Sequence, residues 1–355
     1  TGQVLGGGRR AHLGLTTSYD QLDGISAARA ADGNKEKDGH KITTAHLKTG
    51  YDVTDNFSLL SVVRFAKTAV DLDFTGGPGG DDPNSQQRQQ TISAKIEGSW
   101  LLLDDKWEVI PRVLATDIDR EQDNPADTPD DPNTLNQRYR GRIEAAEMVS
   151  HHRWRSDCVA TVGTRFEKES FRLDDKLDSD NSLPERFTET KSVFAQWYGV
   201  WKRLFGAINL RYDEHLTAGS FTTYRVAPGY RLTDQLTVKA SYATGAKVPA
   251  LFQLYSTFGD PNLKEEEISG YDLGMEYRNK TTSLYLTFFE NHVRNQIDYF
   301  FETQKYANIG RAVAKGLEMD LQQQLSQDVS LTLAYTIQET ENKDTGEALL
   351  RRPHH

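Results

Sequence analysis

The chain of 355 residues carries 42 basic and 52 acidic side chains, which gives a net charge of −10 at pH 7. So acidic a chain excludes a nucleic-acid partner, because phosphate backbones are bound by basic surfaces. No apolar run approaches the length of about eighteen residues that a membrane-spanning helix requires. The mean hydropathy of −0.66 is also low for a large soluble core, although aromatic residues reach 10%.

Alternating apolar and polar residues predict β-strands along most of the chain from Ala11 onward. The clearest case is residues 329–338, where Val, Leu, Leu, Tyr and Ile alternate with Ser, Thr, Ala, Thr and Gln. Charged residues recur on the second face of such strands, as at Glu318 and Asp320. The pattern predicts a sheet with one apolar face and one wet, charged face.

Tight polar turns alternate with long loops between these strands. The turns are predicted near residues 54–56, 104–105, 153–157, 202–203, 233–234, 279–280 and 326–328. The long loops are predicted at residues 21–39, 74–85, 120–134, 173–184, 245–265 and 338–347. Short connections at one end and long ones at the other are typical of up-and-down outer-membrane barrels.

Strand length and aromatic placement favour the same architecture over a soluble sheet with one solvated face. Several strands pass ten residues, and aromatic residues such as Trp100, Trp201 and Phe289 gather towards strand ends, as membrane-interface girdles do. The sequence therefore predicts an all-β fold, an antiparallel up-and-down transmembrane β-barrel with about sixteen strands.

No catalytic constellation is found, and the chain is not expected to be an enzyme. The histidine pairs at His151 and His354 have no acidic partner at metal-ligand spacing. The glycine runs at residues 6–8 and 76–80 lack the Lys-Ser/Thr of a phosphate loop and are interpreted as loops. Cys158, the only cysteine, is interpreted as a small apolar residue on a packed face.

The acidic loop of residues 117–133 contains the candidate metal ligands. Clustered carboxylates on a loop suit Ca²⁺, which takes six to eight oxygen ligands without strict geometry. The candidate calcium ligands are Asp123, Asp127, Asp130 and Asp131. Their spacing does not match an EF-hand, and a solvated, repulsive outer loop is the alternative interpretation. No other cofactor is expected.

The loop within residues 242–272 is unusually apolar for a connection between two strands. It contains Pro and Gly together with a cluster of aromatic and aliphatic side chains. The substrate-binding candidates lie here: Leu251, Phe252, Tyr255 and Phe258.

Three motifs in this half of the chain resemble the barrel of TonB-dependent outer-membrane receptors, most of all the branch of cobalamin and siderophore transporters. They are TGAKVPALFQLYSTFGDPNLKEEEISGYDLGMEY at residues 244–277, YANIGRAVAKGLEMDL at 306–321 and LLRRP at 349–353. The second motif is similar to the family's Tyr-x-Asn-x-Gly pattern followed by Gly-Leu-Glu. The chain differs from the family at Asp260, where Asn is usual, and at Glu265-Glu266, where Pro-Glu is usual.

The resemblance implies that residues 1–355 are a partial β-barrel domain, with about sixteen of about 22 strands and no plug domain. Both chain ends fall within the strand pattern, so the chain is interpreted as the middle of a longer protein. The family's localisation is the outer membrane of a Gram-negative bacterium, surrounded by outer-membrane lipid. Its partners are the TonB complex of the inner membrane, which acts through the plug, and a siderophore or cobalamin-like ligand.

The function that the resemblance implies is TonB-energised uptake of a scarce, bulky nutrient. Charges predicted to line the lumen would hydrogen-bond the plug or the substrate, among them Lys239, Arg211, Glu276 and Glu318. Two alternatives remain open at this point. One is a passive porin-type β-barrel channel, and the other is a soluble secreted β-protein that binds carbohydrate.

Overall fold

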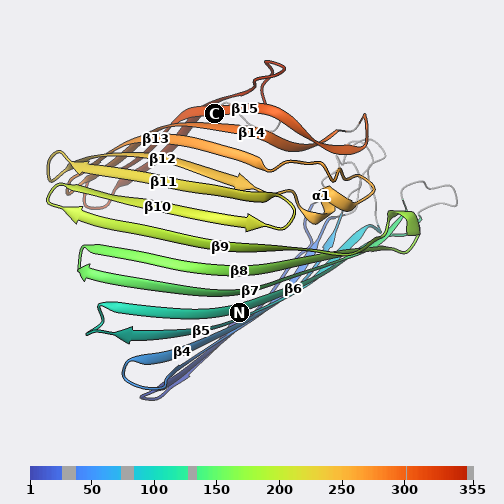
Figure 1. Ribbon diagram of the computed structural model, residues 1–355, viewed down its shortest axis with the longest axis horizontal. Helices are drawn as coiled ribbons and strands as arrows, with labels where there is room; N and C mark the ends of the chain where they lie inside the picture. Colours follow the sequence, from blue (N-terminus) through green and yellow to red (C-terminus); the bar gives the residue numbers. More distant parts are fainter. Residues whose placement is uncertain (26–36, 73–83, 127–133, 301, 350–355) are drawn as a thin grey trace. The chain divides into compact units, whose positions relative to one another are not determined.

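A computed structural model describes residues 1–25, 37–72, 84–126, 134–300 and 302–349 (Figure 1). Its sixteen strands within these ranges form one antiparallel sheet, in which every strand lies beside its neighbours in the sequence. The strands are β1 (Gly2–Gly7), β2 (Ala11–Leu22), β3 (His40–Asp52), β4 (Phe57–Asp71), β5 (Gln86–Leu102), β6 (Trp107–Asn124), β7 (Leu135–Arg155), β8 (Cys158–Asp175), β9 (Leu183–Trp201), β10 (Leu204–His215), β11 (Gly219–Arg231), β12 (Leu236–Lys247), β13 (Glu266–Arg278), β14 (Thr282–Phe300), β15 (Lys305–Gln324) and β16 (Ser330–Asn342). The predicted all-β, up-and-down order with about sixteen strands is confirmed.

Helices are few and short. The described residues contain α1 (Leu251–Tyr255) and the single 3-10 turn η2 (Ser179–Asn181). Within the described ranges, no helix has the length and apolar character needed to cross a membrane.

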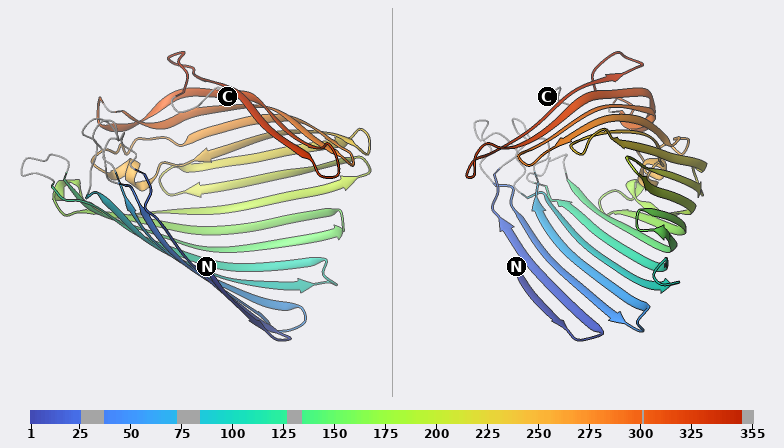
Figure 2. Two further views of the ribbon diagram at one scale, coloured as in Figure 1. Left: turned by 180° about the vertical axis from the view of Figure 1, so that it is seen from behind. Right: turned by 90° about the vertical axis from the view of Figure 1, so that its left-hand side faces the viewer.

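Residue contacts divide the chain into two compact units. Unit 1 contains residues 1–149, 165–190 and 255–257, and unit 2 contains residues 150–164, 191–254 and 258–355. Figure 2 shows the first hairpins of unit 1 in blue and those at the C-terminal end of unit 2 in orange to red.

In unit 1, strand register aligns apolar side chains on one face of the sheet. Leu15 lies opposite Leu47, Leu47 opposite Val63, and Val63 opposite Ala94. Ile96 of β5 is 54% exposed and lies opposite Val113 of β6, which is 53% exposed. Because side chains alternate along a strand, the residues between these positions form a second face, where Glu97 lies opposite Arg112.

In unit 2, the same alternation places a row of apolar residues across five neighbouring strands. Ala240 of β12 begins a row that continues through Leu273, Phe288, Leu317 and Ile337. Leu273 is 61% exposed in this row. Contiguous apolar rows of this extent are unfavourable in water and are typical of a sheet face that contacts lipid.

The predicted tight turns are confirmed at the ends of seven strand pairs, and Trp100 and Trp201 lie near two of them. Phe289 is an exception to the predicted girdles, because it lies near the middle of β14. The connection between β10 and β11 also differs from the predicted alternation, since it is a short turn of residues 216–218. There His215 Nδ1 accepts the backbone N–H groups of Thr217 and Ala218, at 3.3 and 3.1 Å, which closes the turn without a long loop.

Several predicted loops are wrong at their edges. Residues 117–124 of the predicted acidic loop lie in β6, where Asp119 pairs with Arg138 and Asp123 lies opposite Gln86 of β5. Gly6 and Gly7 lie in β1, where they pair with Leu13 and His12, because a sheet ladder needs only backbone groups. Residues 338–342 continue β16 instead of opening a loop, and Thr340 pairs with Ala314. The glycine run at 76–80 lies outside the described residues.

Candidate functional site

The loop that joins β12 to β13, residues 248–265, carries α1 and lies at the end of β12 opposite the tight β11–β12 turn (Figure 1). An ion pair closes its base, with Lys247 Nζ 2.8 Å from Glu266 Oε1. The Glu266 carboxylate is buried, and the same oxygen accepts the backbone N–H of Ile297 at 3.1 Å. The two strands on either side of the loop are therefore tied to each other and to β14.

Aromatic side chains dock this loop on the extended β14–β15 hairpin. The ring of Phe252 contacts Tyr306 edge-on, with 6.2 Å between centroids, and Phe258 contacts Tyr299 in the same way at 6.1 Å. Tyr299 and Tyr306 contact each other at 5.2 Å. Leu251 at the start of α1 is only 2% exposed. Edge-to-face pairs of this kind add to the free energy of apolar burial.

The structure thus brings three of the four substrate-binding candidates, Leu251, Phe252 and Phe258, into one packed loop. Tyr255, the fourth, lies in unit 1 with its ring 5.2 Å from the Arg186 guanidinium. Much of their apolar surface is used to hold the loop, and their role in substrate binding stays a prediction.

A single asparagine completes the docking. Asn308 Nδ2 donates to the carbonyl oxygens of Lys264, at 3.0 Å, and Asn295, at 2.6 Å. Its Oδ1 accepts the backbone N–H of Lys264 at 2.9 Å. We call these three hydrogen bonds the loop clasp. Asn308 is the Asn of the Tyr-x-Asn-x-Gly motif. The motif therefore identified this residue from the sequence, but not the backbone groups to which it hydrogen-bonds.

Gly310, the glycine of the same motif, is required for a different reason. A Cβ at this position would lie 1.7 Å from Asp344 Oδ2, which accepts the backbone N–H of Arg311 at 3.3 Å. The absence of a side chain at Gly310 leaves room for the carboxylate that joins β15 to the segment after β16.

The charged face of unit 2 contains the residues predicted to line a lumen. Lys239 Nζ lies 2.5 Å from Glu276 Oε2, and Arg211 Nη2 lies 2.8 Å from Asp213 Oδ1. Glu318 lies on the same face, in the row that runs from Lys239 across β13 and β14 to β15. Three of the four predicted charges are therefore paired within the sheet.

Unit 1 contains an ion-pair series that sequence analysis did not identify. Arg112 Nε lies 2.6 Å from Glu97 Oε2, and Arg112 Nη1 lies 2.5 Å from Glu147 Oε1. The other oxygen of that carboxylate, Glu147 Oε2, lies 3.3 Å from Arg165 Nη1. Arg165 also pairs with Glu167. We call these five residues the charge ladder. Its residues come from four strands, β5 to β8, so only strand register brings them together.

The calcium candidates are only partly described by the structure. Asp123 Oδ1 accepts a hydrogen bond from Asn136 Nδ2 at 2.9 Å. Asp127, Asp130 and Asp131 lie outside the described residues. Over the part of the chain that the structure describes, no group of three or more His, Cys, Asp and Glu side chains is placed to hold a metal ion. Calcium binding stays a prediction.

Comparison with known proteins identifies the family. Residues 3–355 match the family described as TonB dependent receptor-like, beta-barrel, and the chain belongs to this family. Barrels of this family lie in the outer membrane of Gram-negative bacteria, and that is the location of this protein. The predicted resemblance is confirmed.

Individual proteins that are similar to the chain share between 14 and 30% sequence identity with it. The chain is 30% identical over 160 residues to the vitamin B12 transporter BtuB of Vibrio cholerae serotype O1, an alignment that covers 42% of this chain and 26% of that protein. Among solved structures, the copper transporter OprC is similar with a TM-score of 0.81 and 14% identity, over 98% of this chain and 61% of that one. The siderophore receptor PirA from Acinetobacter baumannii gives a TM-score of 0.77 and 15% identity, over 96% and 59%.

The chain therefore spans about three fifths of the length of these solved receptors. By their names, these three proteins are two transporters and a receptor. At 14 and 15% identity the structural likeness defines the fold and not the ligand.

Proposed function

We propose that the chain is the barrel part of an outer-membrane receptor that takes up a scarce, bulky nutrient with energy from TonB. The observation that carries the proposal is the family match over residues 3–355. A ferric siderophore and a cobalamin-type ligand are the two substrate classes, supported respectively by the siderophore receptors of similar fold and by the 30% identity to a vitamin B12 transporter.

In this proposal the docked loop 248–265 supplies a preformed surface at the long-loop end of the sheet. The loop clasp and the aromatic pairs of Phe252 and Phe258 hold it in one arrangement before any ligand arrives. A surface that is already ordered loses less conformational entropy when it binds, which favours capture of a ligand present at low concentration.

The charged face would provide the wet wall along which the nutrient and a plug domain move. Its ion pairs leave carboxylate oxygens and guanidinium N–H groups that can exchange hydrogen bonds with a moving partner. The proposed activity needs no covalent step, so the protein is proposed to be a transporter and not an enzyme.

Growth rescue tests the proposal and identifies the substrate. A strain that lacks its own uptake receptors is transformed with the full-length gene and grown on cobalamin or on individual ferric siderophores as the limiting nutrient. Rescue by one of these nutrients supports the proposal and names the substrate. Failure on all of them, with the receptor present and folded in the outer membrane, would contradict it.

The calcium hypothesis for the acidic loop is tested by ligand affinity before and after chelation. If Asp123 and its neighbours hold Ca²⁺, chelation should weaken ligand binding and added Ca²⁺ should restore it. An affinity that does not change on chelation would remove calcium from the account.

A further inference from the structure

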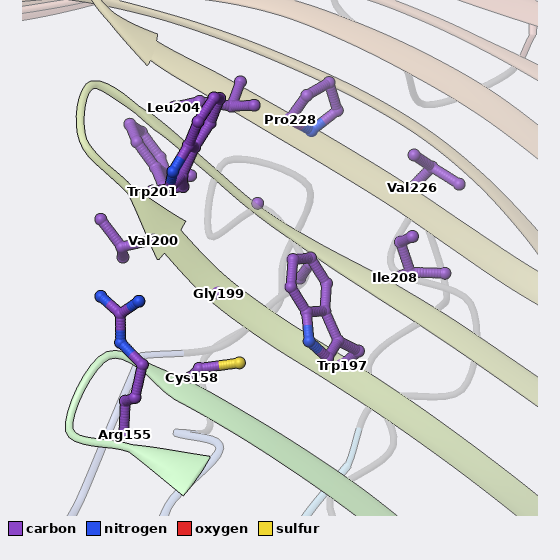
Figure 3. A pocket seen from close by; sticks show the side chains of 13 residues that line it. Arg155, Cys158, Trp197, Gly199, Val200, Trp201, Leu204, Ile208, Val226 and Pro228 are labelled. Atoms are coloured by element: carbon purple, nitrogen blue, oxygen red, sulfur yellow. The ribbon is translucent and has the colours of Figure 1, made fainter. Parts of the chain in front are cut away.

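An apolar hollow of about 340 Å³ opens on the apolar face of unit 2, beside the tight turns (Figure 3). It is lined by β9, β10 and β11, with Arg155 and Cys158 from β7 and β8 at one side. Its volume lies at the lower end of the range of small-ligand sites in proteins. None of the residues named for substrate or calcium binding lies in it.

Two glycines create the hollow. Gly199 lies between Trp197 and Trp201 in β9, and a Cβ at Gly199 would lie 2.5 Å from the Trp197 ring. Gly206 lies opposite Pro228, with Ile208 opposite Val226 further along the same two strands. The Trp197 ring lies against the backbone of Gly199, and Gly206 with Pro228 forms the floor between the two indole rings. Trp197 is 43% and Trp201 66% exposed, so the walls stand open to the surroundings.

Basic side chains lie at the turn end of this hollow. The Arg155 side chain is 66% exposed, and its Nη2 donates to Asp157 at 2.9 Å. A guanidinium has five N–H groups, so this pair leaves donors for a second acceptor. Lys202, in the β9–β10 turn, places its ammonium 5.5 Å from the centre of the Trp201 ring. Backbone bonding holds the two turns together, since Val200 N–H donates to the Asp157 carbonyl at 2.9 Å.

An apolar floor with cations at one end is complementary to an anionic amphiphile. The hollow is continuous with the apolar face of the sheet, where Ile208 and Leu210 are about half exposed, which favours a lipid over a water-soluble ligand. The tight turns of outer-membrane barrels lie on the periplasmic side. The lipid that reaches this end of the strands is therefore a glycerophospholipid of the periplasmic leaflet.

We propose that this hollow is a binding site for an anionic glycerophospholipid. One acyl chain lies between Trp197 and Trp201 over Gly206, and the phosphate contacts Arg155 and Lys202. The site is independent of the nutrient that the receptor transports, so it stands whether or not the proposed substrate is correct.

The test measures which lipids the receptor retains. Full-length receptor is reconstituted into vesicles of equal parts phosphatidylglycerol and phosphatidylcholine with matched acyl chains. It is then released into mild detergent, and the bound lipids are counted by native mass spectrometry. The wild-type protein should retain phosphatidylglycerol in preference to phosphatidylcholine. Arg155→Gln and Lys202→Gln should each reduce that preference by about fivefold, the effect expected of one basic residue at an anionic membrane surface.

Matched controls separate the site from general surface charge. Arg10→Gln removes another exposed arginine that faces an aspartate, Asp55, at the tight turns, and Lys280→Gln removes another turn lysine. Arg10 lies in the β1–β2 turn and Lys280 in the β13–β14 turn, and neither is in the β7–β8 or β9–β10 turn beside the hollow, so neither should change the lipid preference. Trp197→Ala should reduce retention of phosphatidylglycerol, whereas Trp100→Ala, an exposed tryptophan of unit 1, should not.

Each substitution is at an exposed or half-exposed side chain, and folding is verified by the heat-dependent gel migration of intact barrels. Equal retention of the two lipids by wild-type protein would overturn the proposal. The proposal would also be overturned if Arg155→Gln and Arg10→Gln changed the preference for phosphatidylglycerol equally. A polypeptide bound at this face in place of lipid, found in the same spectra, would show that the hollow is a protein-docking surface instead.

Discussion

The loop clasp provides the sharpest mutational prediction. Asn308→Ala removes three hydrogen bonds at once, two to the backbone of Lys264 and one to the carbonyl of Asn295. These bonds join residues that are 44 and 13 positions apart in the sequence, so they fasten the loop to β15 and β15 to β14. The strands themselves keep their ladder bonds, because the substitution leaves the backbone of β15 unchanged.

The expected cost follows from the number of bonds lost. A hydrogen bond in a protein contributes about 0.5–1.5 kcal/mol net, and the three are partly exposed, so the docked loop should lose about 2–3 kcal/mol. Because 1.4 kcal/mol corresponds to a tenfold change, local opening should become about 30- to 150-fold more frequent.

Hydrogen exchange measures this opening directly. The amide of Lys264, which donates to Asn308 Oδ1, should exchange faster in Asn308→Ala by that factor, while amides within β12 keep their wild-type rates. Asn209→Ala, on β10, is the control and should leave Lys264 unchanged. If Lys264 exchanged at the wild-type rate in Asn308→Ala, the clasp would have no energetic role and the reasoning would be refuted.

Three further substitutions test other parts of the structure. Glu266→Ala removes the buried carboxylate at the base of the loop and should lower the free energy of unfolding by about 1–3 kcal/mol. Urea titration in lipid vesicles measures this, and an unchanged midpoint would show that the ion pair with Lys247 does not stabilise the protein. Glu147→Ala should lower the free energy of unfolding by about 1–3 kcal/mol, because two arginines of the charge ladder share that carboxylate. Glu144→Ala is the control: its side chain is 48% exposed, and its loss should cost less than about 1 kcal/mol. Gly310→Ala should lower the thermal midpoint by displacing the Asp344 carboxylate, and Asp344→Ala in that background should not lower it further; additive losses would show that the two residues do not interact.

The strands were predictable because their side chains carry the signal. From residue 329 to 337 large apolar residues alternate with Ser, Thr and the small Ala334, and the structure pairs the strand as that alternation requires. β1 gave no such signal, because Gly6 and Gly7 have no side chains to alternate while their backbone groups pair as well as any others.

The contacts of the candidate site were less predictable for a physical reason. The clasp of Asn308 is made to the backbone of Lys264, and a backbone carbonyl is the same whatever residue carries it. The charge ladder depends on strand register, which places Arg112 beside Glu97 and Glu147, residues that lie 15 and 35 positions away in the chain. Periodicity identifies the face on which such residues lie, but not the partner that each one meets.

The central claim, TonB-energised uptake through this barrel, is tested most directly by transport with and without TonB. Cells that express the full-length receptor are given radiolabelled ligand, the nutrient identified by growth rescue, and uptake is compared with that of an otherwise identical strain lacking TonB. The account predicts uptake in the first strain and binding without uptake in the second. Equal uptake in the two strains, together with large constitutive pores in planar bilayers, would contradict it and favour a passive channel.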